Sequence, residues 1–197
     1  MNASVISTQF ADPIHDAQQA FRGLLAATSR PGTIVTIPLP IASPAPLSPT
    51  LAAIGLTLLD DATPVWLDPI LIQEPIRQYL LFNTGARVVT QPDSAAFAFF
   101  AKARNLPDFR VFPRGTPSYP DRSATLVVQV PLLAGGRPVS LRGPGIESVV
   151  SVEPAGLPDG FWDRWNENAA NYPIGIDMIL ADACSIMSLP RTVKASF

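Results

Sequence analysis

Apolar residues recur at helical spacing near the start of the chain and fall on one face of a helix: Ile14, Ala17, Phe21, Leu24, Leu25 and Thr28. Asp12 can cap the free backbone donors of such a helix, and Pro13 suits its first position, where no N–H is needed. Arg30-Pro31-Gly32 ends it, because a residue before proline is pushed out of the α region. The pattern predicts a helix over residues 13–28.

Shorter apolar stretches bounded by turn residues predict the remaining elements. Helices are expected over 50–59, 74–82 and 159–168, and strands over 33–37, 64–67, 87–90, 124–130, 138–142, 175–180 and 185–189. Residues 94–101 favour a strand because Phe97 and Phe99 alternate, although their alanines would also suit a helix. Gly135-Gly136 is expected to turn the strand at 124–130 into that at 138–142 as its partner, and the last two strands to form a terminal hairpin.

Helices and strands interleave along the chain without an internal repeat. This order predicts an α/β fold in which helices cover a mixed sheet. Residues 38–49 hold five prolines and are expected to form an extended surface loop. The 37 residues before that loop are too few for a stable domain, so we expect a single domain over residues 1–197.

The composition and net charge of the chain limit the kinds of partner that it is expected to bind. Charged residues make up 15% of the chain, and either a partner-binding surface or a large buried sheet would explain so low a value. The formal net charge of −2 argues against nucleic acid, which selects basic surfaces. The first ten residues lack a signal-peptide pattern, and the most apolar stretch, 51–59, is far shorter than the roughly 20 residues that span a bilayer. We therefore expect a cytoplasmic protein with no membrane partner.

Few residues carry recognisable chemistry. His15 and Cys184 are the only histidine and cysteine, so a His/Cys metal cluster cannot be built, and no nucleophile motif accompanies either. Asp60-Asp61 follows a predicted helix, and we interpret it as a solvated helix end, with a Mg²⁺ site as the alternative. No catalytic, cofactor-binding or metal-binding residue is assigned on these grounds.

The nearest imitation of a phosphate loop is Gly143-Pro144-Gly145-Ile146-Glu147-Ser148, which follows a predicted strand. Ser148 stands where a dinucleotide fingerprint has its third glycine, and residues 149–152 favour a strand in place of the required helix. Without a helix N-terminus the usual reason for anion binding is missing. We interpret the segment as a tight turn, with an anion site as the alternative.

Trp162 and Trp165 lie three residues apart on a predicted helix and therefore share a face. Core packing is the default interpretation of such a pair. An interface anchor is the alternative, since tryptophan is enriched at the energetic centres of protein interfaces.

Seven segments, in chain order, resemble the PhnH family over almost the whole sequence: 17–32, 58–67, 82–86, 119–126, 143–146, 172–177 and 189–192. They include Ser29-Arg30-Pro31-Gly32, Tyr119-Pro120-Asp121-Arg122-Ser123 and Leu189-Pro190-Arg191-Thr192. Each segment alone is weak evidence, but seven in the same order make a specific match. The stretches 38–49 and 100–116 match the family least.

The resemblance implies a three-layer α/β/α sandwich with a mixed sheet, like the fold of pyridoxal-phosphate-dependent transferases. It also implies a non-catalytic subunit that assembles with PhnG, PhnI and PhnJ in the carbon–phosphorus lyase core complex. That complex joins a phosphonate to the ribose of a nucleoside triphosphate, before a radical step on PhnJ breaks the C–P bond. A homodimer is expected when the chain is isolated, because the implied fold is usually dimeric.

Pyridoxal phosphate is not expected as a cofactor. Such an enzyme holds its cofactor on a lysine as a Schiff base. Lys102 and Lys194 are the only lysines among the 14 basic residues, and neither is expected to follow a strand in the position that the implied fold requires.

Two classes of function remain open. The first is a complex subunit that scaffolds or shapes the site of a partner. The second is a small enzyme in its own right, which would bind a phosphorylated nucleotide or phosphonate through arginines such as Arg142 and Arg191. A pocket that joins those arginines with a perturbed acid would favour the second class.

Overall fold

A computed structural model of the chain describes residues 10–37 and 41–197. The α-helices are α1 (Pro13–Ser29), α2 (Pro49–Leu58), α3 (Glu74–Thr84) and α4 (Phe161–Ala170). The strands are β1 (Val35–Thr36), β2 (Val65–Leu67), β3 (Val88–Val89), β4 (Phe97–Phe100), β5 (Thr125–Gln129), β6 (Val139–Arg142), β7 (Val150–Val152), β8 (Asp177–Ala181), β9 (Ser185–Leu189) and β10 (Lys194–Ser196). Short 3₁₀ turns occupy 92–94, 103–105, 109–111 and 120–122.

The main sheet has seven strands in the order β1-β9-β8-β5-β4-β2-β3. Its central strands β2, β4, β5 and β8 are parallel, while β9 runs antiparallel to both β8 and β1. The sheet is therefore mixed, as predicted. The continuous apolar strand β5 lies near its centre with its middle residues buried, which is the usual position of such a strand.

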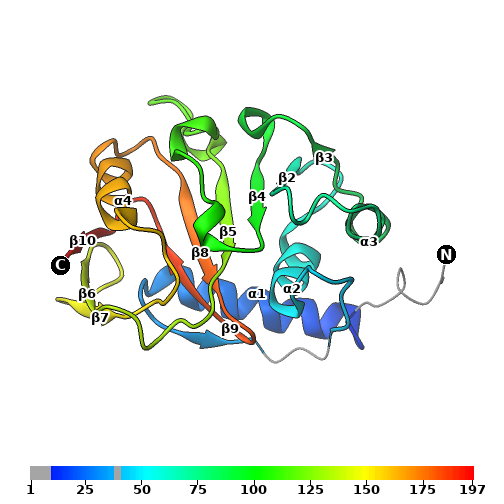
Figure 1. The fold of residues 1–197 in the computed structure, drawn as a ribbon, viewed down its shortest axis with the longest axis horizontal. Helices are drawn as coiled ribbons and strands as arrows, with labels where there is room; N and C mark the ends of the chain where they lie inside the picture. Colours follow the sequence, from blue (N-terminus) through cyan, green and yellow to red (C-terminus); the bar gives the residue numbers. More distant parts are fainter. Residues whose placement is uncertain (1–9, 38–40) are drawn as a thin grey trace.

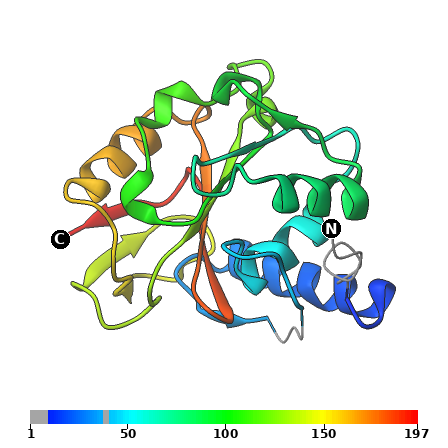
Figure 2. The same ribbon diagram turned by 45° about the vertical axis from the view of Figure 1, so that its right-hand side comes forward.

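Different layers cover the two faces of this sheet. Side chains of α1, α2 and α3 pack on one face in a core that includes Leu24, Ile54 and Leu80. The other face packs against α4 and a second, three-stranded sheet of order β10-β6-β7. Figures 1 and 2 show α4 and the second sheet on the opposite side of the molecule from α2 and α3.

Two details of the predicted architecture are wrong. The strand at 138–142 forms as β6, but it does not continue the main sheet beside β5; it pairs antiparallel with β7 and β10. One outer layer is consequently a small sheet with a single helix, where an α/β/α sandwich would have a layer of helices. The hairpin of β8 and β9 is confirmed, but β10 follows it and supplies the edge of the second sheet.

Helix α1 begins as predicted: the Asp12 carboxylate accepts hydrogen bonds from the backbone N–H groups of Ile14 and His15. Its predicted apolar face is divided in the structure. The residues buried against the core are Ala20, Leu24 and Ala27. The larger side chains Ile14, Phe21 and Leu25 are 85%, 50% and 57% exposed.

Candidate functional site

The residues with the most reactive side chains lie on separate elements. His15 is exposed in the first turn of α1, where its ring Nε2 lies 2.8 Å from the side-chain amide nitrogen of Gln19. Glu147 is exposed in the turn between β6 and β7, and Cys184 in the turn between β8 and β9. No group of three or more His, Cys, Asp or Glu side chains is placed to hold a metal within residues 10–37 and 41–197.

Asp60 belongs to a local turn after α2. Its carboxylate accepts hydrogen bonds from the backbone N–H of Ala62 and the hydroxyl of Thr63, both at 3.0 Å. Asp61 packs on Gly85, which closes α3 with a left-handed φ of 74°. This geometry supports the interpretation of Asp60-Asp61 as an exposed helix end.

The glycines of the segment 143–148 are explained by chain packing. A Cβ at Gly145 would lie 2.3 Å from the carbonyl oxygen of Ser29 and 2.8 Å from the ring of Pro31. The segment leads into β7, so it has no helix N-terminus to bind an anion. The structure supports the tight-turn interpretation, and two of the family-like segments, 17–32 and 143–146, prove to be neighbours in space.

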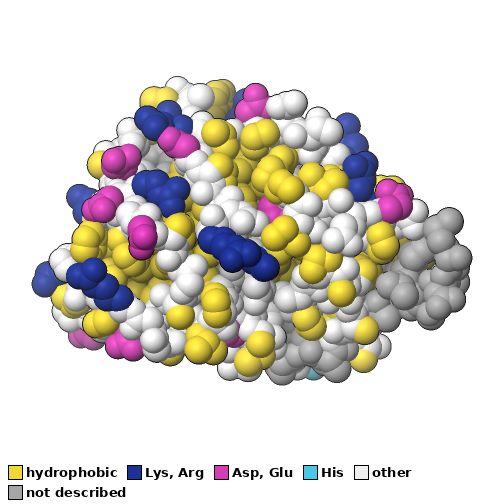
Figure 3. All heavy atoms as spheres, in the orientation of Figure 1, with side chains coloured by type: hydrophobic (Ala, Val, Ile, Leu, Met, Phe, Trp, Pro, Cys, Tyr) yellow, Lys and Arg dark blue, Asp and Glu magenta, His cyan; other side chains and the backbone are white. Residues whose placement is uncertain are grey.

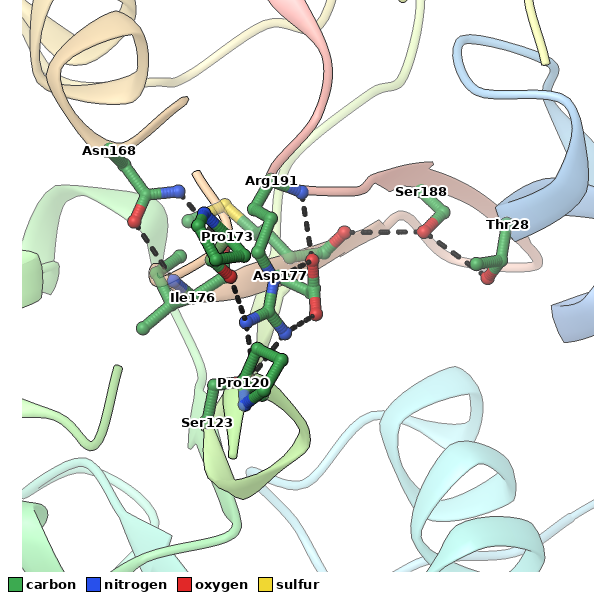
Figure 4. Close-up of polar contacts among 10 residues, drawn as sticks. Thr28, Pro120, Ser123, Asn168, Pro173, Ile176, Asp177, Ser188 and Arg191 are labelled. Atoms are coloured by element: carbon green, nitrogen blue, oxygen red, sulfur yellow. Dashed lines mark hydrogen bonds and ion pairs between the residues drawn. The ribbon is translucent and has the colours of Figure 1, made fainter. Parts of the chain in front are cut away.

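Three other family-like segments meet at the amino ends of the parallel strands. Ser123 precedes β5, Asp177 begins β8, and Arg191 follows β9, whose antiparallel course returns the chain to the same edge. We call these three residues the amino-edge cluster. Figure 4 shows the guanidinium of Arg191 lying between the Asp177 carboxylate and the Pro120 turn.

Every N–H of the Arg191 guanidinium has an acceptor. Nε donates to Asp177 Oδ1 at 3.1 Å, and Nη1 donates to the carbonyl oxygens of Pro120 at 2.9 Å and Pro173 at 3.4 Å. Nη2 donates to Asp177 Oδ2 and to the Ser123 hydroxyl. The Arg191 side chain is only 13% exposed. Its donors are all used within the fold, which leaves none for a substrate.

Asn168, on α4, also forms hydrogen bonds at the amino edge of the main sheet. Its side-chain amide donates to the Ile176 carbonyl and accepts from the Ile176 N–H, each at 2.9 Å. A Cβ at Gly175 would lie 2.9 Å from Asn168 Oδ1, so the glycine permits this approach. On β9, Ser188 accepts from the Thr28 hydroxyl and donates to the Met178 carbonyl, which links α1 to β8 (Figure 4).

Arg142 does not complete an arginine site with Arg191. It is exposed at the end of β6, in register with Lys194 of β10. The hypothesis of a stand-alone enzyme required free arginines, and Arg191 is committed to Asp177. The structure therefore removes the main support for that class of function.

The opposite edge of the main sheet carries an open pocket of about 500 Å³. It lies beyond the carboxyl ends of β4, β5 and β8, and its lining includes Lys102, Arg104, Gln129, Pro131, Gly156 and Ala183. We call it the carboxyl-edge pocket. Lys102 lies two residues after β4, which corresponds to the strand predicted at 94–101. Lys194 lies exposed within β10.

Asp68 holds the wall of this pocket in place. It follows β2 and is fully buried, with one carboxylate oxygen accepting from the N–H groups of Ile70 and Leu71. The other oxygen accepts from the Ala101 N–H at 3.0 Å and from the Asn105 side chain at 3.3 Å. The sequence analysis missed Asp68. A lone aspartate before Pro69, at the end of a short apolar strand, was the available signal.

The tryptophans of α4 differ in their environment. Trp165 is fully buried, and its indole N–H donates to the Val193 carbonyl at 3.0 Å, so the core interpretation is confirmed for it. Trp162 is half-buried and packs edge-on against Phe161 with ring centroids 5.0 Å apart.

None of the helices in the described part of the chain combines the length and the apolar character needed to cross a bilayer.

Comparison with known proteins gives one consistent family. The family described as bacterial phosphonate metabolism protein (PhnH) matches residues 8–196. A protein of Rhizobium meliloti (strain 1021), named alpha-D-ribose 1-methylphosphonate 5-triphosphate synthase subunit PhnH, is 45% identical over 98% of this chain and 96% of its own length. HtxG of Stutzerimonas stutzeri, named as a C-P lyase subunit protein, is 31% identical over 89% of this chain and 83% of its own length.

Proposed function

Because the chain belongs to the PhnH family, we infer that it is an accessory subunit of the enzyme complex that forms ribose 1-phosphonate 5-triphosphate during phosphonate breakdown. The observation that carries this proposal is the 45% identity to a named subunit of that synthase over nearly the full length of both chains. Within the described residues, the polar side chains best placed for chemistry lie on separate elements or are bonded inside the fold. The chain contributes to the reaction by assembling with other subunits.

The partners that we propose are PhnG, PhnI and PhnJ, and in the isolated state a second copy of this chain. Helix α1 offers a surface suited to such contacts. Ile14, Phe21 and Leu25 are spaced by seven and four residues, which places them along one exposed side of the helix. We call these three residues the α1 stripe. Exposed apolar side chains that are contiguous are typical of protein interfaces.

The remaining expectations are part of the same proposal. The chain acts as one PhnH-like domain in the cytoplasm, with a main sheet that resembles that of pyridoxal-phosphate-dependent transferases. It uses no cofactor of its own. Lys102 is exposed at the rim of an open pocket, where no aromatic side chain of the lining can stack on a pyridine ring. Borohydride reduction with one equivalent of pyridoxal phosphate should therefore leave both lysines unmodified.

The proposal is tested by copurification with the other subunits of the complex. We expect the wild-type chain to copurify, and Phe21→Asp/Leu25→Asp to lose binding while its circular dichroism and unfolding midpoint stay unchanged. Leu132→Asp is the matched control, since Leu132 is 58% exposed on another part of the surface and Leu25 is 57% exposed. A wild-type chain that does not copurify contradicts the proposed function. A double variant that still binds contradicts only the role of the α1 stripe.

A further inference from the structure

The carboxyl-edge pocket lies beyond the carboxyl ends of the parallel strands, which is the end of an open α/β sheet where ligands bind. Strands β2, β4, β5 and β8 are parallel, and the chain leaves β2 for β3 on one side before it returns to β4 on the other. In such sheets, ligands bind beyond the carboxyl ends of the strands, at or near the point where the connections change direction. The connections change direction between β2 and β4. The Asp68 carboxylate occupies this place and accepts hydrogen bonds from the Ala101 N–H and the Asn105 side chain. The open volume lies beside it, beyond β4, β5 and β8.

Only cations supply the charged groups of this pocket. Lys102 and Arg104 line it, and neither takes part in an ion pair within the described residues. Four other hollows on the described surface each include at least one carboxylate in their lining. In Figure 3 a group of Lys and Arg side chains lies over the carboxyl end of β4, in the centre of the face shown.

The polar groups around the two cations are held in fixed positions. Lys102 directly precedes a short 3₁₀ turn, and Arg104 lies within it. The Asp68 carboxylate holds both sides of this turn, because it accepts hydrogen bonds from the Ala101 N–H and the Asn105 side chain. Gln129 ends β5, and its Oε1 accepts from the Ser48 hydroxyl at 2.5 Å. The amide nitrogen of Gln129 donates one N–H to the Val130 carbonyl at 3.4 Å, which leaves its second N–H as a neutral donor in the pocket that Lys102 and Arg104 also line. The backbone that carries the two cations therefore needs little reordering to receive an anion, which lowers the cost of binding.

We propose that the carboxyl-edge pocket binds a phosphorus oxyanion of a small molecule, held by Lys102, Arg104 and the amide nitrogen of Gln129. Arginine supplies a planar fork that matches a tetrahedral oxyanion, and lysine adds a compact charge. The volume of about 500 Å³ accepts a ligand larger than a single phosphate group. The proposal does not depend on the assembly of the chain with other subunits, because every group involved belongs to this chain.

The test is titration of the isolated chain at low ionic strength with inorganic phosphate, methylphosphonate and tripolyphosphate. Binding is followed by calorimetry and by the amide signals of residues 101–104 and 129–131. We expect at least one probe to bind with shifts confined to these residues, and Lys102→Gln/Arg104→Gln to weaken it by about tenfold or more. The probe that binds most tightly distinguishes a phosphate, a phosphonate and an extended polyanion as the source of the oxyanion.

A matched control separates local from overall charge. Arg30→Gln/Lys194→Gln removes the same two charges from exposed positions outside the pocket, and its affinity should stay within twofold of wild type. The proposal is overturned if no probe shifts the pocket signals at 10 mM, or if the control pair loses as much affinity as the pocket pair. Copurification with partner subunits is unaffected by either of these outcomes, so this inference and the proposed function fail separately.

Discussion

The two edges of the main sheet use cationic side chains in opposite ways. At the amino edge, Arg191 is 13% exposed and its five N–H groups all donate to acceptors of the fold. At the carboxyl edge, Lys102 and Arg104 are exposed at the rim of a pocket and have no ion-pair partner among the described residues. A guanidinium with every donor used stabilises the fold, whereas cations left free in a pocket are available to a ligand.

The contrast between the two edges also shows what the family-like segments do in the fold. Those at 119–126, 172–177 and 189–192 meet in the amino-edge cluster, and those at 17–32 and 143–146 meet where Gly145 contacts Ser29. These segments specify how the chain packs. The carboxyl-edge pocket draws its cations from 100–116, one of the stretches that resembles the family least.

Loss of Arg191 should give the largest effect on stability. Arg191→Leu leaves the Asp177 carboxylate, 31% exposed, without its cation. It also removes the guanidinium donor from the turn at 120–123 and from the Pro173 carbonyl. We expect a loss of about 3 kcal/mol in the free energy of unfolding, the lower part of the range for breaking a buried pair. Urea unfolding measures it. Arg142→Leu, at an exposed arginine, should stay within about 0.5 kcal/mol of wild type. Equal losses in the two variants would contradict the comparison.

Asp68→Ala should give the next largest effect. The substitution leaves the part-buried N–H groups of Ile70 and Ala101 without their carboxylate acceptor, whereas the Leu71 N–H keeps the backbone carbonyl of residue 68. An unsatisfied buried donor costs about 1–3 kcal/mol, so we expect a loss of about 2 kcal/mol in unfolding free energy. Hydrogen exchange at Ala101 and nearby amides should also rise. Unchanged exchange there would show that Asp68 does not hold the pocket wall.

Lys102→Gln/Arg104→Gln should leave stability unchanged, within about 0.5 kcal/mol, since neither side chain has a partner in the described fold. An unchanged unfolding free energy here, beside the loss expected for Arg191→Leu, would sharpen the contrast between the two edges. A loss above about 1 kcal/mol would show that the two cations stabilise the fold, and would weaken the case for a binding role.

The smallest effect concerns Asp108, an exposed residue on the segment between β4 and β5. A hydrogen bond from the Arg110 guanidinium lowers the pKa of this carboxyl group from 3.8 to about 2. Because the folded-state pKa is lowered, the pair stabilises the fold above about pH 4, and this contribution is lost as the pH falls towards 2. The group is exposed, so the change in stability is small. Carbon-detected titration should place the pKa near 2 in wild type and near 3.8 in Arg110→Gln.

Local signals in the sequence predicted most of the elements. Asp12-Pro13 marks the beginning of α1, and the ranges predicted at 50–59 and 74–82 correspond to α2 and α3. Which strands distant in the sequence pair with one another was harder to predict from the sequence. The Gly135-Gly136 turn indicated a hairpin of β5 and β6, but β6 joins β7 and β10, because its apolar side packs into the second core with Trp165.

The candidate sites were harder to predict, because they depend on which charges remain free. Arg191 and Lys102 are both single cations near the end of an apolar strand, and the sequence alone does not distinguish them. Only the fold pairs Asp177 with Arg191 and leaves Lys102 without an ion-pair partner among the described residues. In the same way, the spacing of the apolar residues in α1 predicted Leu24 as a core residue, but it did not single out Ala20 and Ala27, which are also buried there.

The most direct measurement of the proposed role is reconstitution of ribose 1-phosphonate 5-triphosphate synthesis from purified subunits. We predict no product from this chain alone, none from the other subunits without it, and full activity when all are combined. His15→Ala and Glu147→Gln should restore the same activity as wild type, since both side chains are exposed on separate elements. If either variant folds and joins the complex yet lowers product formation by orders of magnitude, the chain carries a catalytic group and the accessory role is wrong.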